Sequence, residues 1–125
     1  MIKGIGIDTV SVKRIRAILE RHSEGALERL FSGDELSAAS VRADKAEYLA
    51  ARFAVKEAVY KAVAHLTKRH SFDLRIVSSL NDSDGCPYVV MTDALKSVLE
   101  EAGVAQLHLS VTTEDGLATA FIIAE

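Results

Sequence analysis

The sequence predicts an α+β fold in which early helices and one long buried helix pack on an antiparallel sheet. Helical periodicity gathers in the first half of the chain, whereas strand-like alternation gathers in the second half. The segment from about residue 44 to about residue 66 is apolar around most of its helical circumference, which is typical of a helix buried on most sides. The chain has 125 residues, of which 49% are hydrophobic, so we expect residues 1–125 to form a single domain with a small core.

The first predicted element is a short strand over residues 1–8, which is apolar and rich in β-branched side chains. Alternate residues of a strand point to opposite faces, so Gly4, Gly6 and Asp8 share one face. That face is nearly bare, and another element can therefore approach it closely. Asp8 would stand at the end of this strand.

The remaining elements follow from periodicity and from capping and turn residues. The expected helical segments are residues 11–22, with Ser11 as N-cap, then 26–31, a further turn at 35–39 after a break at 32–34, and 44–66. The expected strands are residues 72–79, 87–91, 107–112 and 117–124, with turns at 81–85 and 113–116 and a helix from Asp93 to about residue 103.

The long predicted helix carries charges in an apolar setting. Alanines occupy positions 50, 51, 54, 58 and 62, so the charged residues among them need partners or solvent. Glu57 and Lys61 are four residues apart and share a helix face. The simplest interpretation is an exposed ion pair worth about 0.3–0.5 kcal/mol. The apolar neighbours favour a packed or ligand-facing position over a solvated one. If Asp8 joins Glu57, two carboxylates could hold one Mg²⁺, and Lys61 would lie beside a phosphoryl group.

Composition limits the other possibilities. The net charge of −3 gives no support for nucleic-acid binding. Basic residues do cluster early, at Lys13, Arg14, Arg16 and Arg21, and they form either a docking face for an acidic partner or an ordinary solvated helix face. Cys86 is the only cysteine, and no apolar run has the length of a signal peptide core or a membrane span. We therefore expect a cytoplasmic protein that does not enter a membrane.

Several segments together resemble those of the small holo-acyl-carrier-protein synthases, a group of 4′-phosphopantetheinyl transferases. The matching segments are residues 4–8, 12–15, 50–62, 84–88, 109–111 and 118–123. Within residues 50–62, the series Arg52-Phe53-Ala54, Lys56-Glu57-Ala58 and Lys61-Ala62 is the most specific. The likeness covers nearly the whole chain in matching order, and it implies a 4′-phosphopantetheinyl transferase-like fold.

The resemblance implies a reaction of fatty acid biosynthesis and lipid metabolism. Such enzymes need Mg²⁺ and move 4′-phosphopantetheine from coenzyme A to a serine of an apo acyl carrier protein, or of a polyketide or peptide carrier domain, releasing 3′,5′-ADP. They form homotrimers with active sites between adjacent subunits.

The resemblance also assigns roles to residues. Asp8 and Glu57 match the metal-binding carboxylates and form the catalytic set with Lys61, which lies near the transferred phosphate. The residues implied in coenzyme A binding are Arg52, Lys61, Pro87 and Thr113. The residues implied in carrier-protein binding are Arg14, Lys13 and Arg21.

The sequence departs from the family pattern at two places. Residues 63–70 contain no glycine, where the family has a glycine-rich stretch, and Thr113 stands where the family has a histidine. Two functions therefore stay open at this point: an active transferase, and a non-catalytic member that binds carrier protein or coenzyme A. The acceptor of the serine proton is also open between a carboxylate and a metal-bound water.

Overall fold

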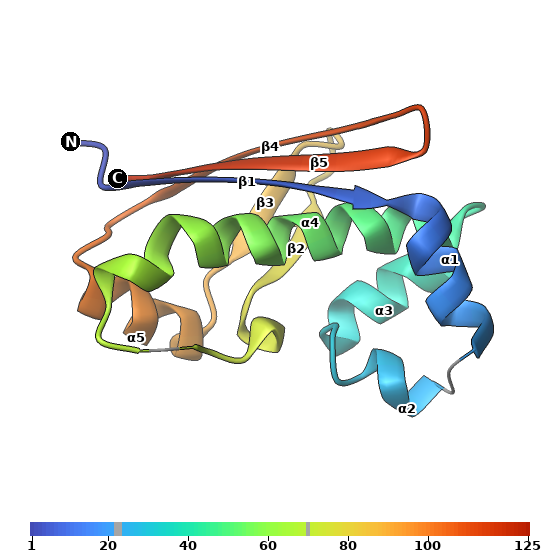
Figure 1. The fold of residues 1–125 in the computed structure, drawn as a ribbon, viewed down its shortest axis with the longest axis horizontal. Helices are drawn as coiled ribbons and strands as arrows, with labels where there is room; N and C mark the ends of the chain where they lie inside the picture. The colour runs from blue at the N-terminus through green and yellow to red at the C-terminus, as the bar shows by residue number, and fades with distance from the viewer. Residues whose placement is uncertain (22–23, 70) are drawn as a thin grey trace.

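A computed structural model describes residues 1–21, 24–69 and 71–125 of the chain (Figure 1). Its central element is α4 (Lys45–Val63), which runs along one face of an antiparallel sheet. The smaller helices α1, α2 and α3 gather around one end of α4, while α5 lies near the other end. The expected α+β architecture is confirmed. No helix within the described ranges combines the length and apolarity that crossing a membrane requires.

The elements follow one another in an order close to the prediction. The helices are α1 (Val12–Arg21), α2 (Glu24–Leu27), α3 (Gly33–Ser40), α4, the 3₁₀ turns η1 (Ala64–Leu66) and η2 (Leu74–Ile76), and α5 (Asp93–Ala102). The strands are β1 (Gly4–Ser11), β2 (Ser78–Asn81), β3 (Pro87–Val90), β4 (Leu107–Glu114) and β5 (Leu117–Ala124).

The strands form two separate antiparallel sheets. The larger sheet has the order β1–β5–β4, and the smaller one is the β2–β3 hairpin. β1 pairs with β5 along its whole length, from Gly4 opposite Ala124 to Ser11 opposite Leu117. β4 and β5 are joined by a tight turn at Asp115 and Gly116, whose φ angles are 51° and 74°. Two central residues with positive φ are typical of the turn that matches the twist of a hairpin.

The seam between β1 and α4 is unusually close. A Cβ added to Gly4 would lie 1.9 Å from the carbonyl oxygen of Ala62, and one added to Gly6 would lie 1.8 Å from that of Ala58. The facing side of α4 consists of buried alanines, so backbone approaches backbone. The expectation that the bare glycine face of the first strand admits a close neighbour is confirmed. This seam fixes which part of α4 lies beneath each residue of β1.

Some local predictions were wrong. Residues 72–77 do not extend the strand. Asp73 accepts a hydrogen bond from the backbone N–H of Arg75 (2.9 Å) and starts the 3₁₀ turn η2, so that β2 begins only at Ser78. The expected break at residues 32–34 is shorter than predicted, because Ser32 is the N-cap of α3, which starts at Gly33, and Glu35 closes the capping box. The helical turn expected at residues 35–39 lies within α3. Thr92 caps α5 in place of Asp93.

The first helix begins as expected. The hydroxyl of Ser11 accepts a hydrogen bond from the backbone N–H of Arg14 (3.3 Å), although Ser11 also ends β1. Val12 and Ile15 bury the apolar stripe of this helix. Its predicted end at His22 lies outside the described residues. α2 ends at Leu27, which is shorter than the expected helix over residues 26–31.

Candidate functional site

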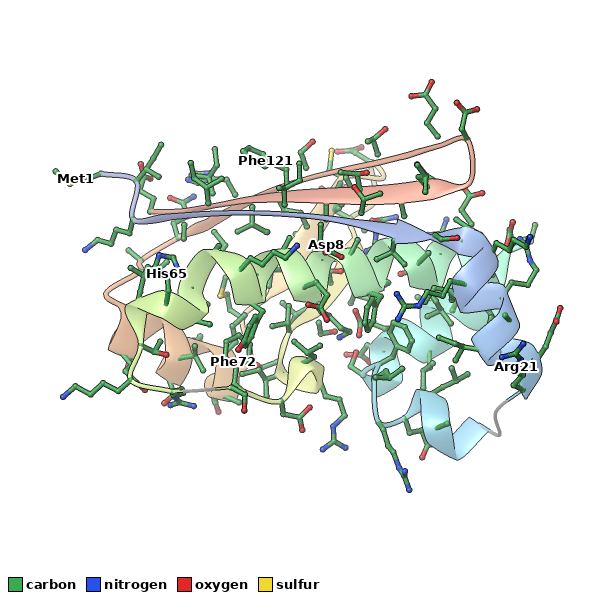
Figure 2. The ribbon with its side chains drawn as sticks, viewed as in Figure 1. Met1, Asp8, Arg21, His65, Phe72 and Phe121 are labelled. Carbon is green, nitrogen blue, oxygen red and sulfur yellow. The ribbon has the colours of Figure 1, made fainter. Side chains whose placement is uncertain are left out.

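The β1–α4 seam brings Asp8 and Lys61 together, although 53 positions separate them in the sequence. The Lys61 ammonium donates to Asp8 Oδ1 (2.9 Å) and to the carbonyl of Ile7 (3.0 Å). Figure 2 shows Asp8 on β1 where the strand passes over α4. The Lys61 side chain is about half exposed, so this ion pair lies at the surface end of the seam.

Glu57 lies on α4 one turn before Lys61, and its side chain is half-buried. Gly6 of β1 packs over Ala58 of α4. Asp8 follows Gly6 by two residues and lies on the same face of β1. Glu57 precedes Ala58, so it belongs to the stretch of α4 that β1 crosses. Within the described part of the chain, Lys61 pairs with Asp8, whereas Glu57 makes no ion pair. The simple Glu57–Lys61 helix pair is therefore not what the structure contains.

The chemistry of this donor set fits Mg²⁺. Both acidic groups supply hard oxygen ligands, and Mg²⁺ commonly takes one or two carboxylates together with waters and substrate phosphates. Among residues 1–21, 24–69 and 71–125, no group of three or more acidic, histidine or cysteine side chains gathers at one point. A site formed by Asp8 and Glu57 therefore leaves most of the coordination shell to water and substrate.

A second set of predicted residues lines a cleft of about 440 Å³ beside the β2–β3 hairpin. Arg52, Pro87 and Thr113 all contribute to its wall, together with residues of the loop before α4. Asp8, Glu57 and Lys61 do not line this cleft. A single chain thus separates the predicted site residues into two groups on different surfaces.

Arg52 is held rigidly in the wall of this larger cleft. Its guanidinium lies 4.8 Å from the ring centroid of Tyr48, and Arg42 lies over the same ring at 4.8 Å. One terminal nitrogen of Arg52 donates to Asn81 Oδ1 (3.4 Å). Only 3% of Arg52 is exposed, and within the described residues its Nε has no hydrogen-bond partner. Burial lowers the pKa of Arg52, but a guanidinium keeps its charge in proteins.

A smaller cleft of about 370 Å³ opens beside Lys61. It is lined by Tyr60, Lys61, Ala64, His65 and Arg69. These residues include part of the stretch that lacks the family's glycines. Arg69 lines this cleft with its guanidinium already paired, because its Nε donates to Glu101 Oε2 (2.7 Å).

The basic residues of α1 are exposed. Lys13, Arg14 and Arg21 reach solvent, as a docking face requires. Arg16 differs from them because its guanidinium makes two hydrogen bonds with the Asp44 carboxylate, at 2.9 and 3.1 Å. Arg16 therefore connects α1 to the start of α4.

Sequence reasoning missed several residues of the larger cleft. Arg42, Tyr48 and Asn81 line it and surround Arg52. The spacing of Tyr48 and Arg52, four residues apart on one helix, was an available signal for stacking. Arg42 and Asn81 come from loops and strands far from Arg52, and no periodicity indicates them.

The family is shown by comparison with known proteins. The model of the 4′-phosphopantetheinyl transferase superfamily matches residues 4–122. A holo-[acyl-carrier-protein] synthase of Renibacterium salmoninarum is 42% identical over 125 residues, which cover 100% of this chain and 99% of that protein. The chain belongs to the 4′-phosphopantetheinyl transferase superfamily.

Solved structures agree with the fold. The holo-[acyl-carrier-protein] synthase of Neisseria meningitidis superimposes with a TM-score of 0.88 at 35% identity, covering 100% of this chain and 99% of that one. A holo-(acyl-carrier-protein) synthase of Bacillus anthracis, solved in complex with CoA (3′,5′-ADP), superimposes with a TM-score of 0.77 at 27% identity. The alignment covers 99% of this chain and 96% of the Bacillus anthracis chain.

Proposed function

We propose that this protein transfers 4′-phosphopantetheine from coenzyme A to a serine of an apo acyl carrier protein, in a Mg²⁺-dependent reaction that releases 3′,5′-ADP. The observation that carries the proposal is the seam on which Asp8, Glu57 and Lys61 lie, in a chain that belongs to the transferase superfamily. A carboxylate pair beside an ammonium is a suitable arrangement for a pyrophosphate and its divalent cation.

Each residue of the seam has a role in the proposed reaction. Asp8 and Glu57 would hold Mg²⁺, which neutralises charge on the pyrophosphate when it is bound. Lys61 would turn from Asp8 and donate to an oxygen of the transferred phosphoryl group. The carrier serine attacks the β-phosphorus, and the bond to 3′,5′-ADP breaks. The serine proton passes to a carboxylate or to a water molecule.

The larger cleft is the proposed binding place for the nucleotide end of coenzyme A. Arg52 presents a buried positive charge there, and Pro87 and Thr113 line the same cleft. A rigid guanidinium, already desolvated and stacked on Tyr48, would bind a phosphate with little loss of side-chain freedom. The similar Bacillus anthracis protein, solved with CoA (3′,5′-ADP), supports the ligand class.

We propose a homotrimer, because the two groups of site residues lie on different surfaces of one chain. On the face of the larger sheet that points away from α4, β1 and β5 expose apolar side chains, among them Ile7 (56%) and Phe121 (37%). Figure 2 shows Phe121 on this face. Ile7 and Phe121 are opposite each other in the β1–β5 pairing. Covering this face with copies of the chain would bury apolar surface. Each site would then combine the seam of one subunit with the cleft of its neighbour.

The carrier protein would dock on α1, where Arg14, Lys13 and Arg21 are exposed. Its acidic surface would meet these cations, and such complementarity steers encounter and fixes orientation. Cys86 is exposed and unpaired, which suits the reducing cytoplasm where we place the reaction.

The proposal is tested by incubating the protein with coenzyme A, Mg²⁺ and a panel of apo carrier proteins, and measuring carrier mass. A gain of one phosphopantetheine group is expected with wild type, and its loss is expected with Glu57→Ala. Glu100→Ala, on an exposed part of α5 that belongs neither to the seam nor to either cleft, is the matched control. Coenzyme A binding without any transfer would support the alternative, a non-catalytic binding protein, which the threonine at position 113 motivates.

A further inference from the structure

A lysine and a glutamate form an ion pair in the interior of the molecule, outside both clefts. Lys56 Nζ lies 2.6 Å from Glu35 Oε1, and both side chains are 0% exposed. Moving two charges out of water is costly, and a buried ion pair is often no more stabilising than well-packed apolar residues. General stability therefore does not explain why these two charges are buried here.

The Lys56 ammonium attaches α4 to the segment that leads into the smaller sheet. Besides Glu35, it donates to the backbone carbonyl of Leu74 (3.3 Å) and, through a short hydrogen bond, to that of Val77. All three donors of the ammonium can thus be satisfied. Burial lowers the pKa of Lys56, and the neighbouring Glu35 carboxylate opposes this effect. The side chain thus holds η2, from its first residue to the residue after its end, against the side of α4.

The Glu35 carboxylate attaches α3 to the start of β2. Its Oε1 accepts from the backbone N–H of Ser32 (3.0 Å), which closes the capping box of α3. Its Oε2 accepts from the backbone N–H of Ser79 in β2 (3.2 Å). The hydroxyls of Ser32 and Ser78 are 2.7 Å apart and add a parallel link between the same two segments.

The two elements that this ion pair joins lead directly into the two parts of the proposed site, the seam and the larger cleft. Lys56 precedes Glu57 on α4, so its attachment fixes the rotation of the helix that carries Glu57 and Lys61. β2 leads to Asn81, which accepts a hydrogen bond from Arg52 and pairs with Pro87 across the hairpin.

We propose that Lys56 and Glu35 are positioning residues, whose ion pair sets α4 and the β2–β3 hairpin in the geometry that both halves of the site require. The proposal rests on the proposed function, since it concerns the same site. Displacements of about 1 Å far from the reacting atoms can lower rates by about 100-fold, so loss of this attachment should be visible in function.

The test compares Glu35→Gln with Leu95→Ala, a core substitution on α5 at a residue that is 0% exposed and lines neither cleft. Leu95→Ala shows how lost stability affects coenzyme A binding and transfer when the ion pair is kept. Ser78→Ala, which removes only the parallel link, is a milder variant that serves if Glu35→Gln does not fold. The Kd for coenzyme A is measured by calorimetry, and KM and kcat are measured in the transfer assay, at a temperature where circular dichroism shows every variant folded.

Glu35→Gln is expected to weaken coenzyme A binding and raise its KM by about tenfold, whereas Leu95→Ala keeps both values near wild type. Ser78→Ala should change them in the same direction by a smaller factor. If Glu35→Gln and Leu95→Ala had equal Kd and KM values for coenzyme A, the positioning role would be overturned. If Glu35→Gln is unfolded, equal values in Ser78→Ala and wild type would overturn it instead. Wild type that binds coenzyme A but transfers nothing would overturn the proposed function alone, because the binding comparison still tests the ion pair. Wild type that does not bind coenzyme A would overturn both.

Discussion

Gly6 is the residue at which the β1–α4 seam tolerates least change. A Cβ added to Gly6 would lie 1.8 Å from the Ala58 carbonyl oxygen and 2.9 Å from the Ala62 nitrogen, so the backbone of one element would have to move. We expect Gly6→Ala to lower the free energy of unfolding by about 1–3 kcal/mol or more, as overpacking does. Equilibrium urea denaturation measures this change.

Gly33→Ala is the matched control for this substitution. Gly33 begins α3, and a Cβ added there meets nothing within 4 Å, so its effect should stay within about 0.5 kcal/mol. If Gly6→Ala were as stable as Gly33→Ala, the close approach of β1 to α4 would be contradicted.

Lys61 should weaken metal binding, because its ammonium is paired with Asp8, one of the two proposed metal ligands. Its ammonium is 2.9 Å from Asp8 Oδ1, so a divalent cation must compete with it. We expect Lys61→Met to bind Mn²⁺ more tightly than wild type, by up to about fivefold, the factor that corresponds to an exposed ion pair of about 1 kcal/mol. Its transfer rate should nevertheless fall, because the phosphoryl group loses its cation. Calorimetric titration with Mn²⁺ measures the first effect, and weaker Mn²⁺ binding would contradict the competition.

At the scale of elements, the start of α4 should depend on pH through its N-cap. The Asp44 carboxylate accepts a hydrogen bond from the backbone N–H of Glu47 and lies beside Arg16, and these contacts hold its pKa below its ordinary value of 3.8. A carboxylate with a lowered folded-state pKa stabilises the protein above its unfolded value and loses this effect as pH falls through the folded value.

Asp44→Asn tests this effect, because asparagine is also a good N-cap but carries no charge. Wild type should have the higher Tm at pH 7, and the difference between the two proteins should shrink below about pH 4. Thermal melts from pH 7 to about pH 2.5 measure it. A Tm difference that stays constant over this range would show that the charge of Asp44 contributes nothing.

α1 should determine the affinity for the carrier protein. Arg14 is exposed on this helix, so Arg14→Glu places a negative charge where an acidic partner would dock. We expect the KM for the carrier protein to rise about tenfold while the KM for coenzyme A stays unchanged. Lys96→Glu, the same charge change on exposed α5, is the control. Equal effects of both substitutions would assign the loss to net charge rather than to docking.

Elements with a strong local pattern could be predicted from the sequence, whereas weakly patterned ones could not. The Ala-rich helix, the turn over residues 81–85, the alternating strand β4 and the apolar strand β5 lie where their patterns predicted them. The expected strand over residues 72–79 was wrong because its apolar residues suit a strand, while Asp73 caps a 3₁₀ turn and Lys56 binds two carbonyls of this segment. The second of these contacts is tertiary and leaves no local signal.

At the scale of the whole molecule, the proposed trimer predicts that two inactive variants regain activity when they assemble together. If each site takes Glu57 from one subunit and Arg52 from the next, Glu57→Ala and Arg52→Met are each inactive alone. Random co-assembly of the two variants should restore about a quarter of the sites, since one in four interfaces joins two intact halves. Transfer activity of the co-expressed mixture measures this recovery. A mixture as inactive as its components would place the complete site within one chain.

The site could be predicted only as far as the family motifs reach. The contact of Asp8 with Lys61 spans 53 positions, and the link from Glu35 to Ser79 spans 44. No spacing rule connects residues so far apart. The helix pattern and the strand end indicated Glu57, Lys61 and Asp8 as candidates, and the resemblance gave a reason to join them, whereas the Lys56–Glu35 pair left no signal in the sequence. The residues on the outer face of the larger sheet, by contrast, follow from the alternation of side chains along β1 and β5 once the pairing of these strands is known.

The pairing of β1 with β5 also affects how the chain assembles during synthesis. The central strand of the larger sheet is β5, which leaves the ribosome after every other described element, whereas both of its neighbours are made earlier. Until β5 emerges, β1 and β4 have no partner in that sheet. Completion of the larger sheet is therefore a late event, and the nascent chain carries unpaired strand edges that chaperones would have to shield.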